Sequence, residues 1–201
     1  MAQTTDVSTG ALMNTKPTTN QEIKLEDSRL TELCKANDPA GQEMLYERYV
    51  NSMFRTCIRY ISSEHEAEDT MIGGFVKVFK NIGKFEYRGN GSLEGWIKRI
   101  MINECLMALR KKKREQVSLD NVSNLIKCNG SLEDRLNEEE IYNAVRTLPN
   151  GYRTVFNMYA IEGYSHKEIA EKLGISENTS KSQLSKARSA LIKKLTKIGA
   201  I

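Results

Sequence analysis

The sequence contains little of what enzymes, metal proteins and disulfide-rich proteins need. Among 201 residues there are two histidines and four cysteines. The cysteines form no CxxC pair and have no histidine at metal-ligand spacing, which argues against a zinc site and a disulfide framework. Nucleophile–base pairs and glycine-rich phosphate loops are also missing. We therefore expect no metal, no cofactor, no small-molecule substrate and no catalytic activity, and we interpret the cysteines as reduced thiols, mostly in a core.

Long apolar runs are absent as well. The longest spans only a few residues, far short of the roughly 20 that a membrane-spanning helix requires. The N-terminus lacks the charged, apolar and small-residue segments of a secretory signal peptide. No stretch longer than about five residues alternates between apolar and polar with period two, so β-strands are not expected. These absences predict an all-α protein that stays in the cytoplasm.

Basic residues are present in two separate clusters, although the net charge is only +4. Residues 110–114 are an unbroken run of arginine and lysine, and residues 181–197 form a second basic-rich stretch. Two such clusters favour a polyanionic partner such as DNA. The plainer alternative for the first run is a solvated helix end.

Composition divides the chain into four parts. Residues 1–25 are rich in Thr, Asn, Gln and Ser, which is typical of a disordered tail. Residues 26–114 carry helical patterns and form a first small domain. Residues 115–137 mix Ser, Asn, Asp and Gly with few aliphatic residues, as flexible linkers do. Residues 138–201 form a second small helical domain.

Helix starts and apolar faces are visible in the first domain. Asp38-Pro39 predicts an N-cap followed by proline at the first helical position, and Ser63 with Glu66 predicts a capping box. Between them, apolar residues recur at three- and four-residue spacing and indicate one buried helix face: Met44, Leu45, Val50, Met53, Phe54, Cys57, Ile58 and Ile61. A later helix has a second apolar stripe, which leaves Lys98, Arg99 and Asn103 on other faces: Leu93, Trp96, Ile97, Ile100 and Met101.

The second domain has the pattern of a helix-turn-helix. Ser165 and Glu168 form a capping box that opens a short helix, Gly174 ends it, and Ser176 caps a longer helix. If Leu184, Ala187 and Leu191 face the core, a polar set lies on the open side, where it can contact base edges or phosphates: Asn178, Thr179, Lys181, Ser182, Gln183, Ser185, Lys186 and Arg188. The alternative is a surface helix of an α-hairpin. His166 has no nucleophile or metal partner in the motif, so we expect no chemistry there.

The same domain carries three motifs in a fixed order: Leu148-Pro149-Asn150-Gly151-Tyr152-Arg153, then Glu162 to Ala170, then Leu173 to Arg188. This order closely resembles region four of the extracytoplasmic-function (ECF) subfamily of sigma-70-type RNA polymerase sigma factors. In detail it is similar to versions found in the Bacteroidetes. The first domain is similar to region two of that family, through Leu45-Tyr46-Glu47-Arg48-Tyr49, Ala67-Glu68-Asp69, Phe75, Phe79, Gly91-Ser92-Leu93, Trp96-Ile97 and Arg99-Ile100.

The resemblance implies a transcription initiation factor that binds core RNA polymerase, through the beta and beta-prime subunits, and promoter DNA. It implies polymerase contacts through Glu68, Asp69, Ile72 and Phe75. It implies that the protein binds the −10 element and helps to separate its strands. The residues implied in this binding are Tyr87, Asn90, Lys98, Arg99, Asn103, Arg110, Lys111 and Lys112. The resemblance also implies that the polar set of the second domain binds the −35 element. An anti-sigma factor, commonly a membrane protein, is expected to regulate the protein.

Two departures from the family pattern stand out. Ile72-Gly73-Gly74 replaces a polar pair that usually precedes Phe75, and Ser180 stands where a small apolar core residue is usual. The competing hypothesis is a conventional transcriptional regulator that binds duplex DNA through its helix-turn-helix without being a polymerase subunit. Against it, the first domain shows no ligand-pocket or phospho-acceptor signature and carries the basic loop and helix instead.

Overall fold

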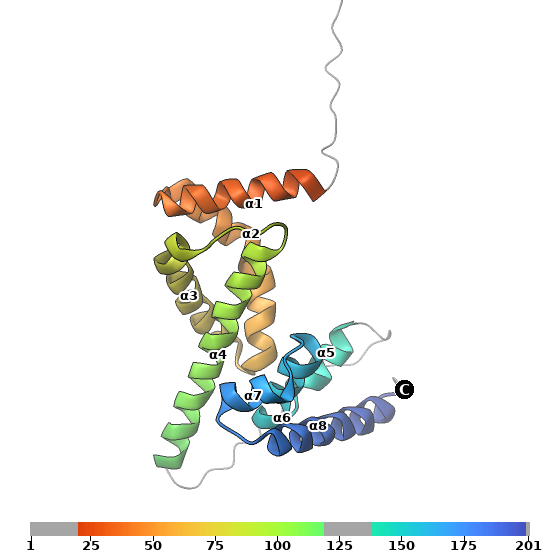
Figure 1. The fold of residues 1–201 in the computed structure, drawn as a ribbon. Coiled ribbons are helices and arrows are strands. Elements are labelled where there is room, and N and C mark those ends of the chain that lie inside the picture. Colours follow the sequence, from red (N-terminus) through yellow and green to blue (C-terminus); the bar gives the residue numbers. More distant parts are fainter. Residues whose placement is uncertain (1–19, 119–137, 200–201) are drawn as a thin grey trace, which may run out of the picture.

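The chain folds into two groups of helices that lie against each other (Figure 1). The structure is a computed structural model and describes residues 20–118 and 138–199. All regular structure in these ranges is helical, which confirms the all-α prediction. Residues 1–19 of the predicted tail, and the part of the predicted linker over 119–137, lie outside the described residues. No helix in the described ranges combines the length and the apolarity that crossing a membrane requires.

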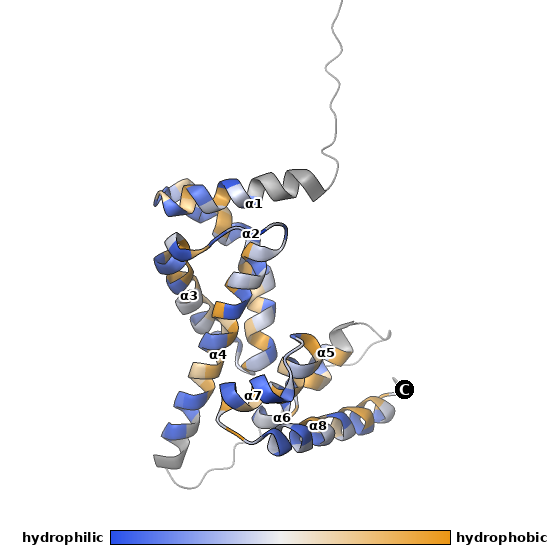
Figure 2. Cartoon of the chain, viewed as in Figure 1, coloured by the Kyte–Doolittle hydropathy of each residue, from blue (hydrophilic) through white to orange (hydrophobic). Residues whose placement is uncertain are grey.

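The first group contains α1 (Asn20–Lys35), α2 (Pro39–Tyr60), α3 (Glu64–Asn81), the short 3-10 turn η1 (Ile82–Lys84) and α4 (Ser92–Ser118). Helices α2, α3 and α4 pack pairwise around one core. Apolar residues recur along each helix rather than in one continuous block (Figure 2). This spacing gives each helix a buried face and an exposed one.

Helix α1 begins at Asn20, so the helix includes residues 20–25, which the sequence analysis placed in the tail. The helix is held from its second half, where Asp27 accepts hydrogen bonds from Tyr49 Oη and Arg48 Nη1, each at 2.9 Å. Leu30 and Cys34 are buried on the same side. An anchored helix extends at little cost, because each added residue forms one more hydrogen bond. Composition alone therefore placed the end of the tail at residue 25, several residues after the start of α1.

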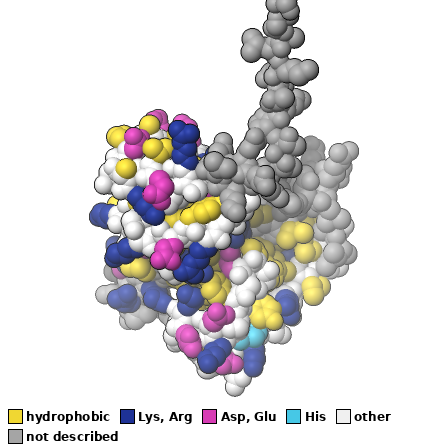
Figure 3. Space-filling model, turned by 45° about the horizontal axis from the view of Figure 1, so that its top comes forward, with side chains coloured by type: hydrophobic (Ala, Val, Ile, Leu, Met, Phe, Trp, Pro, Cys, Tyr) yellow, Lys and Arg dark blue, Asp and Glu magenta, His cyan; other side chains and the backbone are white. Residues whose placement is uncertain are grey.

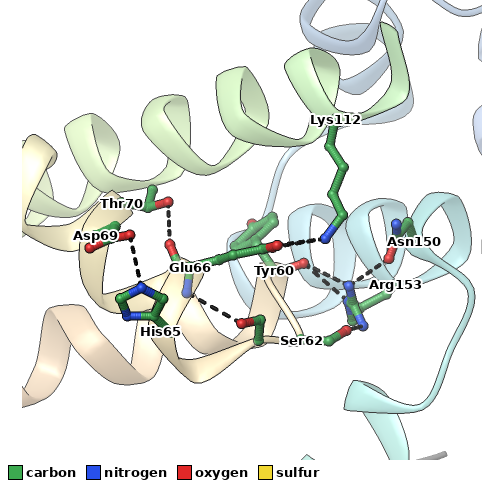
Figure 4. Close-up of polar contacts among 10 residues, drawn as sticks. Tyr60, Ser62, His65, Glu66, Asp69, Thr70, Lys112, Asn150 and Arg153 are labelled. Atoms are coloured by element: carbon green, nitrogen blue, oxygen red, sulfur yellow. Dashed lines mark hydrogen bonds and ion pairs between the residues drawn. The ribbon is translucent and has the colours of Figure 1, made fainter. Parts of the chain in front are cut away.

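The predicted helix starts are present in the first group. Asp38 accepts a hydrogen bond from Gly41 N at 2.8 Å, and Ser63 accepts one from Glu66 N at 3.3 Å. The reciprocal half of the capping box at Ser63 does not form. Glu66 pairs instead with Lys112 of α4 at 2.7 Å (Figure 4), because a tertiary cation competes for the carboxylate.

The apolar face predicted for residues 44–61 is correct with one exception. Leu45, Met53 and Cys57 are completely buried, whereas Met44 is 52% exposed. Met44 is adjacent to Leu45, and neighbouring residues on a helix point in different directions. Helical spacing identifies a stripe, but the edge of that stripe depends on which helix packs against it.

Gly74 allows α3 and α4 to approach closely. A Cβ atom built at Gly74 would lie 2.3 Å from Sδ of Met101, which is completely buried on α4. Gly73 has open space beside it. The two glycines that break the family pattern therefore differ, since only Gly74 is required by helix packing.

The second group contains α5 (Glu138–Arg146), α6 (Asn150–Phe156), the π-helical turn η2 (Asn157–Ile161), α7 (His166–Leu173) and α8 (Glu177–Lys197). Ser165 and Glu168 form the predicted capping box, Gly174 ends α7 in the left-handed conformation with φ 66°, and Ser176 caps α8. The helix-turn-helix prediction is therefore confirmed. Its local signals suffice because each acts within a few residues.

The two groups share a buried interface. One apolar cluster includes Cys57, Ile58 and Leu106 of the first group together with Val155 and Met158 of the second. Four buried side-chain atoms lack a hydrogen-bond partner among the described residues, and all four lie at or beside this interface: Nε of Arg59, Oη of Tyr60, Nε of Arg146 and Oδ1 of Asn157. An unpaired buried polar atom costs about 1–3 kcal/mol. The interface is thus less fully satisfied than the interior of either group.

Candidate polymerase and promoter interfaces

The polar face of α8 lies opposite a buried stripe. Ser180, Leu184, Ala187 and Leu191 point inward and are at most 7% exposed. The predicted readout residues occupy the other side, where six are exposed and two are half-buried: Asn178, Lys181, Ser182, Ser185, Lys186 and Arg188 exposed, Thr179 and Gln183 half-buried. Gln183 lies against Gly151, since a Cβ atom there would be 3.4 Å from Gln183 Oε1. The helix therefore offers donors and acceptors at the spacing that a major groove can accept.

Ser180 and His166 join the two helices of the motif. Ser180 is completely buried, and its Oγ lies 2.9 Å from Nδ1 of His166. The His166 ring stacks on Tyr159 with centroids 4.5 Å apart, and the guanidinium of Arg188 lies 5.8 Å from the Tyr159 ring. From the sequence, Ser180 was only a departure from the family pattern, and His166 was a residue with no nucleophile or metal partner in the motif. The structure brings them together across the turn.

Tyr87 and Asn90 face each other in the loop between η1 and α4. Tyr87 Oη donates to Asn90 Oδ1 at 3.3 Å. Ser92 holds the loop closed by donating to the carbonyl of Gly89 at 2.6 Å, and Gly89 and Gly91 both have positive φ. Glycine makes that turn possible without steric cost. The loop is thus a fixed turn with one aromatic and one amide side chain close together.

The predicted −10 residues on α4 fall into two groups. Arg99, Asn103 and Lys111 are exposed. Lys98, Arg110 and Lys112 are engaged by other parts of the chain: Lys98 pairs with Glu162 at 2.7 Å, Lys112 with Glu66, and Arg110 donates to the carbonyl of Lys172. On the face shown in Figure 3, Lys and Arg side chains lie close to Asp and Glu side chains.

A mixed acidic and apolar stripe runs along the outside of α3. Glu68 and Asp69 are exposed, and Ile72 and Val76 are 48% and 47% exposed. Glu68, Ile72 and Val76 are four residues apart and therefore share one face. Phe75 does not belong to this surface. It is 3% exposed and packs edge-to-face on Tyr46, so we correct its assignment from polymerase contact to core.

Sequence reasoning missed the residues that join the two groups. Arg153 is 2% exposed and donates to the backbone carbonyl of Tyr60 from Nε and Nη2, at 3.2 and 2.9 Å (Figure 4). Asn157 donates to the carbonyl of Arg59 at 2.6 Å. The C-terminal carbonyls of a helix are unpaired within that helix, so any helix end can accept such donors. Sequence patterns could not identify Arg153 and Asn157 as these donors, because each lies more than 90 residues from the carbonyl that it binds.

No group of three or more His, Cys, Asp or Glu side chains suited to a metal occurs in the described part of the chain. The remaining features are those of a two-part helical protein with a helix-turn-helix, an aromatic–amide loop and exposed basic residues. These features are typical of one class of protein, the DNA-binding transcription factors.

Comparison with known proteins gives the family. Residues 45–115 match Sigma-70 region 2, and residues 138–191 match Sigma-70, region 4. The chain is 28% identical over 180 residues to the ECF RNA polymerase sigma factor SigW of Bacillus subtilis, covering 83% of this chain and 95% of SigW. It is 25% identical to the RNA polymerase sigma-H factor of Pseudomonas aeruginosa, covering 85% and 94%. A solved structure of the sigma factor RpoE from Bartonella quintana shares the fold, with a TM-score of 0.52, 23% identity and coverage of 77% and 96%.

The two region matches lie in the order that the motifs predicted and together cover more than half of the chain. The chain belongs to the ECF subfamily of sigma-70-type sigma factors and is an RNA polymerase sigma factor, which directs core enzyme to promoters at initiation. The region 2 match disfavours a conventional helix-turn-helix regulator, since such a protein has no need of a polymerase-binding domain. The closer likeness to Bacteroidetes versions stays a prediction.

Proposed function

We propose that the two groups divide promoter recognition between them. The first binds core polymerase through Glu68, Asp69 and Ile72 on α3, and reads and opens the −10 element through the Tyr87–Asn90 loop and α4. The second reads the −35 element through α8. The observation that carries the proposal is α8, where a fully buried stripe is backed by a continuous polar and basic face.

The α8 face contains two kinds of contact. Asn178, Ser182 and Gln183 can bond base edges and so carry sequence preference, whereas Lys181, Lys186 and Arg188 can neutralise phosphates. Tyr87 offers a stacking surface and Asn90 an amide for an unstacked base. The exposed apolar residues Ile72 and Val76 beside two carboxylates fit a partner surface with apolar and basic groups.

The protein acts by binding and catalyses no reaction of its own. Because polymerase and promoter DNA are cytoplasmic, we place its action in the cytoplasm. The solved structure of RpoE contains that factor in complex with an anti-sigma factor, NepR. This complex supports an anti-sigma factor as the regulator of the present protein as well, and that regulator would be either membrane-bound or free in the cytoplasm.

Run-off transcription tests the proposal. Purified core polymerase is combined with this protein on a genomic promoter library, and transcripts are sequenced. We expect transcripts that require the protein and that share a −10 and a −35 sequence. Asn178→Ala should change the preferred −35 sequence, whereas Lys186→Ala should weaken all promoters alike and reduce the salt dependence. No core binding together with retained duplex binding would instead support a conventional regulator.

A further inference from the structure

A groove of about 810 Å³ runs between α3 and α4. Gly73 lines it from α3, and a Cβ atom built at Gly73 would meet no atom of another helix within 4 Å. Met107 and Ala108 line the same groove from α4, and Met107 is 53% exposed. Two small residues beside one exposed apolar side chain thus leave a hollow. We refer to Gly73, Met107 and Ala108 as the Gly73 notch.

Two ion pairs join α3 and α4 on either side of the notch. Glu66 of α3 pairs with Lys112 of α4 at 2.7 Å (Figure 4). Lys77 of α3 pairs with Glu104 of α4 at 2.6 Å. Gly73 lies between Glu66 and Lys77 along α3. Because the two helices are held together at both ends of this stretch, the notch is a fixed feature of the fold.

The two walls of the groove carry opposite charge. Asp69 lies about one helical turn before Gly73 and lines the α3 wall, with a side chain that is 67% exposed. Arg110, Lys111 and Arg114 line the α4 wall, and all three are exposed. DNA carries charge of one sign only, so its phosphates would be repelled along the α3 wall. A protein segment can present a basic residue to one wall and an acidic residue to the other.

The notch also marks a departure from the family pattern within the polymerase-binding region. It lies inside residues 45–115, which match Sigma-70 region 2. Ile72-Gly73-Gly74 stands where a polar pair is usual, so an apolar residue and a gap replace hydrogen-bonding groups. A polar partner group that entered the notch would lose its water without gaining a hydrogen bond, which costs free energy. An apolar partner group would instead gain from burial.

We propose that the Gly73 notch receives one large apolar side chain, such as Leu, Met or Phe, from a segment of core RNA polymerase. This inference rests on the proposed function, in which α3 binds the polymerase. The segment also carries a basic residue that pairs with Asp69. Met107 packs beside the inserted side chain, because a flexible thioether adapts to different apolar shapes. The notch then selects polymerases with an apolar residue at this contact, since a polar residue there would stay unpaired.

The test fills the notch with a side chain of the protein itself, in the variant Gly73→Leu. Leucine is a better helix former than glycine, so the variant should fold, and circular dichroism verifies this. The full-length protein carries fluorescein at its N-terminus, and anisotropy follows its titration with purified core polymerase from the same bacterium. We expect Gly73→Leu to bind about ten- to thirtyfold more weakly, because it removes a central apolar contact of the interface. The loss should be similar at about 100 and 300 mM NaCl, since steric exclusion is not screened by salt.

Two further variants separate filling of the notch from other effects. Gly95→Leu adds the same side chain at an exposed glycine of α4 that also has open space. It should leave core binding within about twofold. Asp69→Asn removes the rim charge without filling the notch. It should weaken binding about three- to fivefold at low salt and less at high salt. Analytical ultracentrifugation of each protein reports whether a second copy occupies the groove.

The results distinguish the notch from the proposed function. Weaker core binding by Gly73→Leu at both salt concentrations, with Gly95→Leu unchanged, supports the notch. Equal binding by folded Gly73→Leu and the original protein overturns it. If Asp69→Asn still weakens binding in that case, α3 remains the polymerase surface and the proposed function stands. An original protein that binds no core polymerase overturns the proposed function, and the notch fails with it. A dimer that Gly73→Leu converts to a monomer, with core binding unchanged, assigns the groove to a second copy and overturns the polymerase as its occupant.

Discussion

Arg153 of α6 donates two hydrogen bonds to the backbone carbonyl of Tyr60, the last residue of α2. The same guanidinium donates to the carbonyl of Arg146 at 2.7 Å and to Asn150 Oδ1 at 2.7 Å. One buried cation therefore ties together the end of α2, the end of α5 and the start of α6. This arrangement links the stability of the second group to its contact with the first.

Arg153→Ala should lower the free energy of unfolding by about 2–4 kcal/mol, because the carbonyls of Tyr60 and Arg146 stay buried without their donor. Urea unfolding followed by circular dichroism measures the change. Arg188→Ala, which removes the same charge at an exposed position, should change it by less than about 0.5 kcal/mol. Equal midpoints for the two variants would show that Arg153 contributes no more than a surface arginine.

Gly73→Ala and Gly74→Ala make a matched pair on α3. Alanine is favoured over glycine in a helix by about 1 kcal/mol, and Gly73 has room for the added carbon. At Gly74 the new Cβ would collide with buried Met101, and overpacking of this kind costs about 1–3 kcal/mol. We expect Gly73→Ala to raise the melting temperature of the protein. We expect the Gly74→Ala variant to melt several degrees below the Gly73→Ala variant. If both variants gain the same stability, the Met101 side chain or α4 must shift enough to accommodate the added carbon at Gly74.

Ser180→Ala should destabilise the helix-turn-helix by about 1 kcal/mol, because Nδ1 of His166 loses its partner. The matched control is Ser185→Ala, on the exposed face of the same helix, where a change below about 0.5 kcal/mol is expected. Thermal melting of the full-length protein gives both values. A neutral Ser180→Ala would mean that the small size of the side chain matters there, and its hydroxyl does not.

The cysteines of the first group should resist alkylation in the folded protein. Cys34, Cys57 and Cys105 are all completely buried. Burial, with a smaller contribution from Asp38, raises the pKa of the Cys34 thiol to about 11. At pH 8 only about one Cys34 in a thousand is the reactive thiolate.

Iodoacetamide labelling at pH 8, read by mass spectrometry in a Cys128→Ser background, checks this expectation. Label should appear at these three positions only after urea unfolds the protein. Rapid labelling of Cys34 under native conditions would show that the contact between α1 and α2 opens readily.

Much of the fold could be predicted from the sequence because the decisive signals are local. Asp38, Ser165, Gly174 and Ser176 each act through hydrogen bonds or backbone geometry within four residues. The helix-turn-helix and the polar face of α8 follow from them and from helical periodicity. The candidate site on α8 was accordingly predictable to the level of which residues are exposed.

Other assignments depended on neighbours that the sequence cannot name. Phe75 and Met44 both occur in apolar patterns, yet one is buried under Tyr46 and the other is exposed. Glu66 was expected to complete a cap but pairs with Lys112 of another helix. Phe75 packs on Tyr46 of α2, and Glu66 pairs with Lys112 of α4. Both outcomes depend on a helix that is distant in the sequence.

The sequence alone thus determined the helical class, the family and the order of the two regions, because caps, glycine turns and periodic apolar stripes operate over one or two helical turns. Only the tertiary structure decided that Gly74 is required by Met101, that Ser180 meets His166, and that Glu162 lies between Arg59 and Lys98. Those relationships depend on how helices approach in space. Distance along the chain carries no information about that approach.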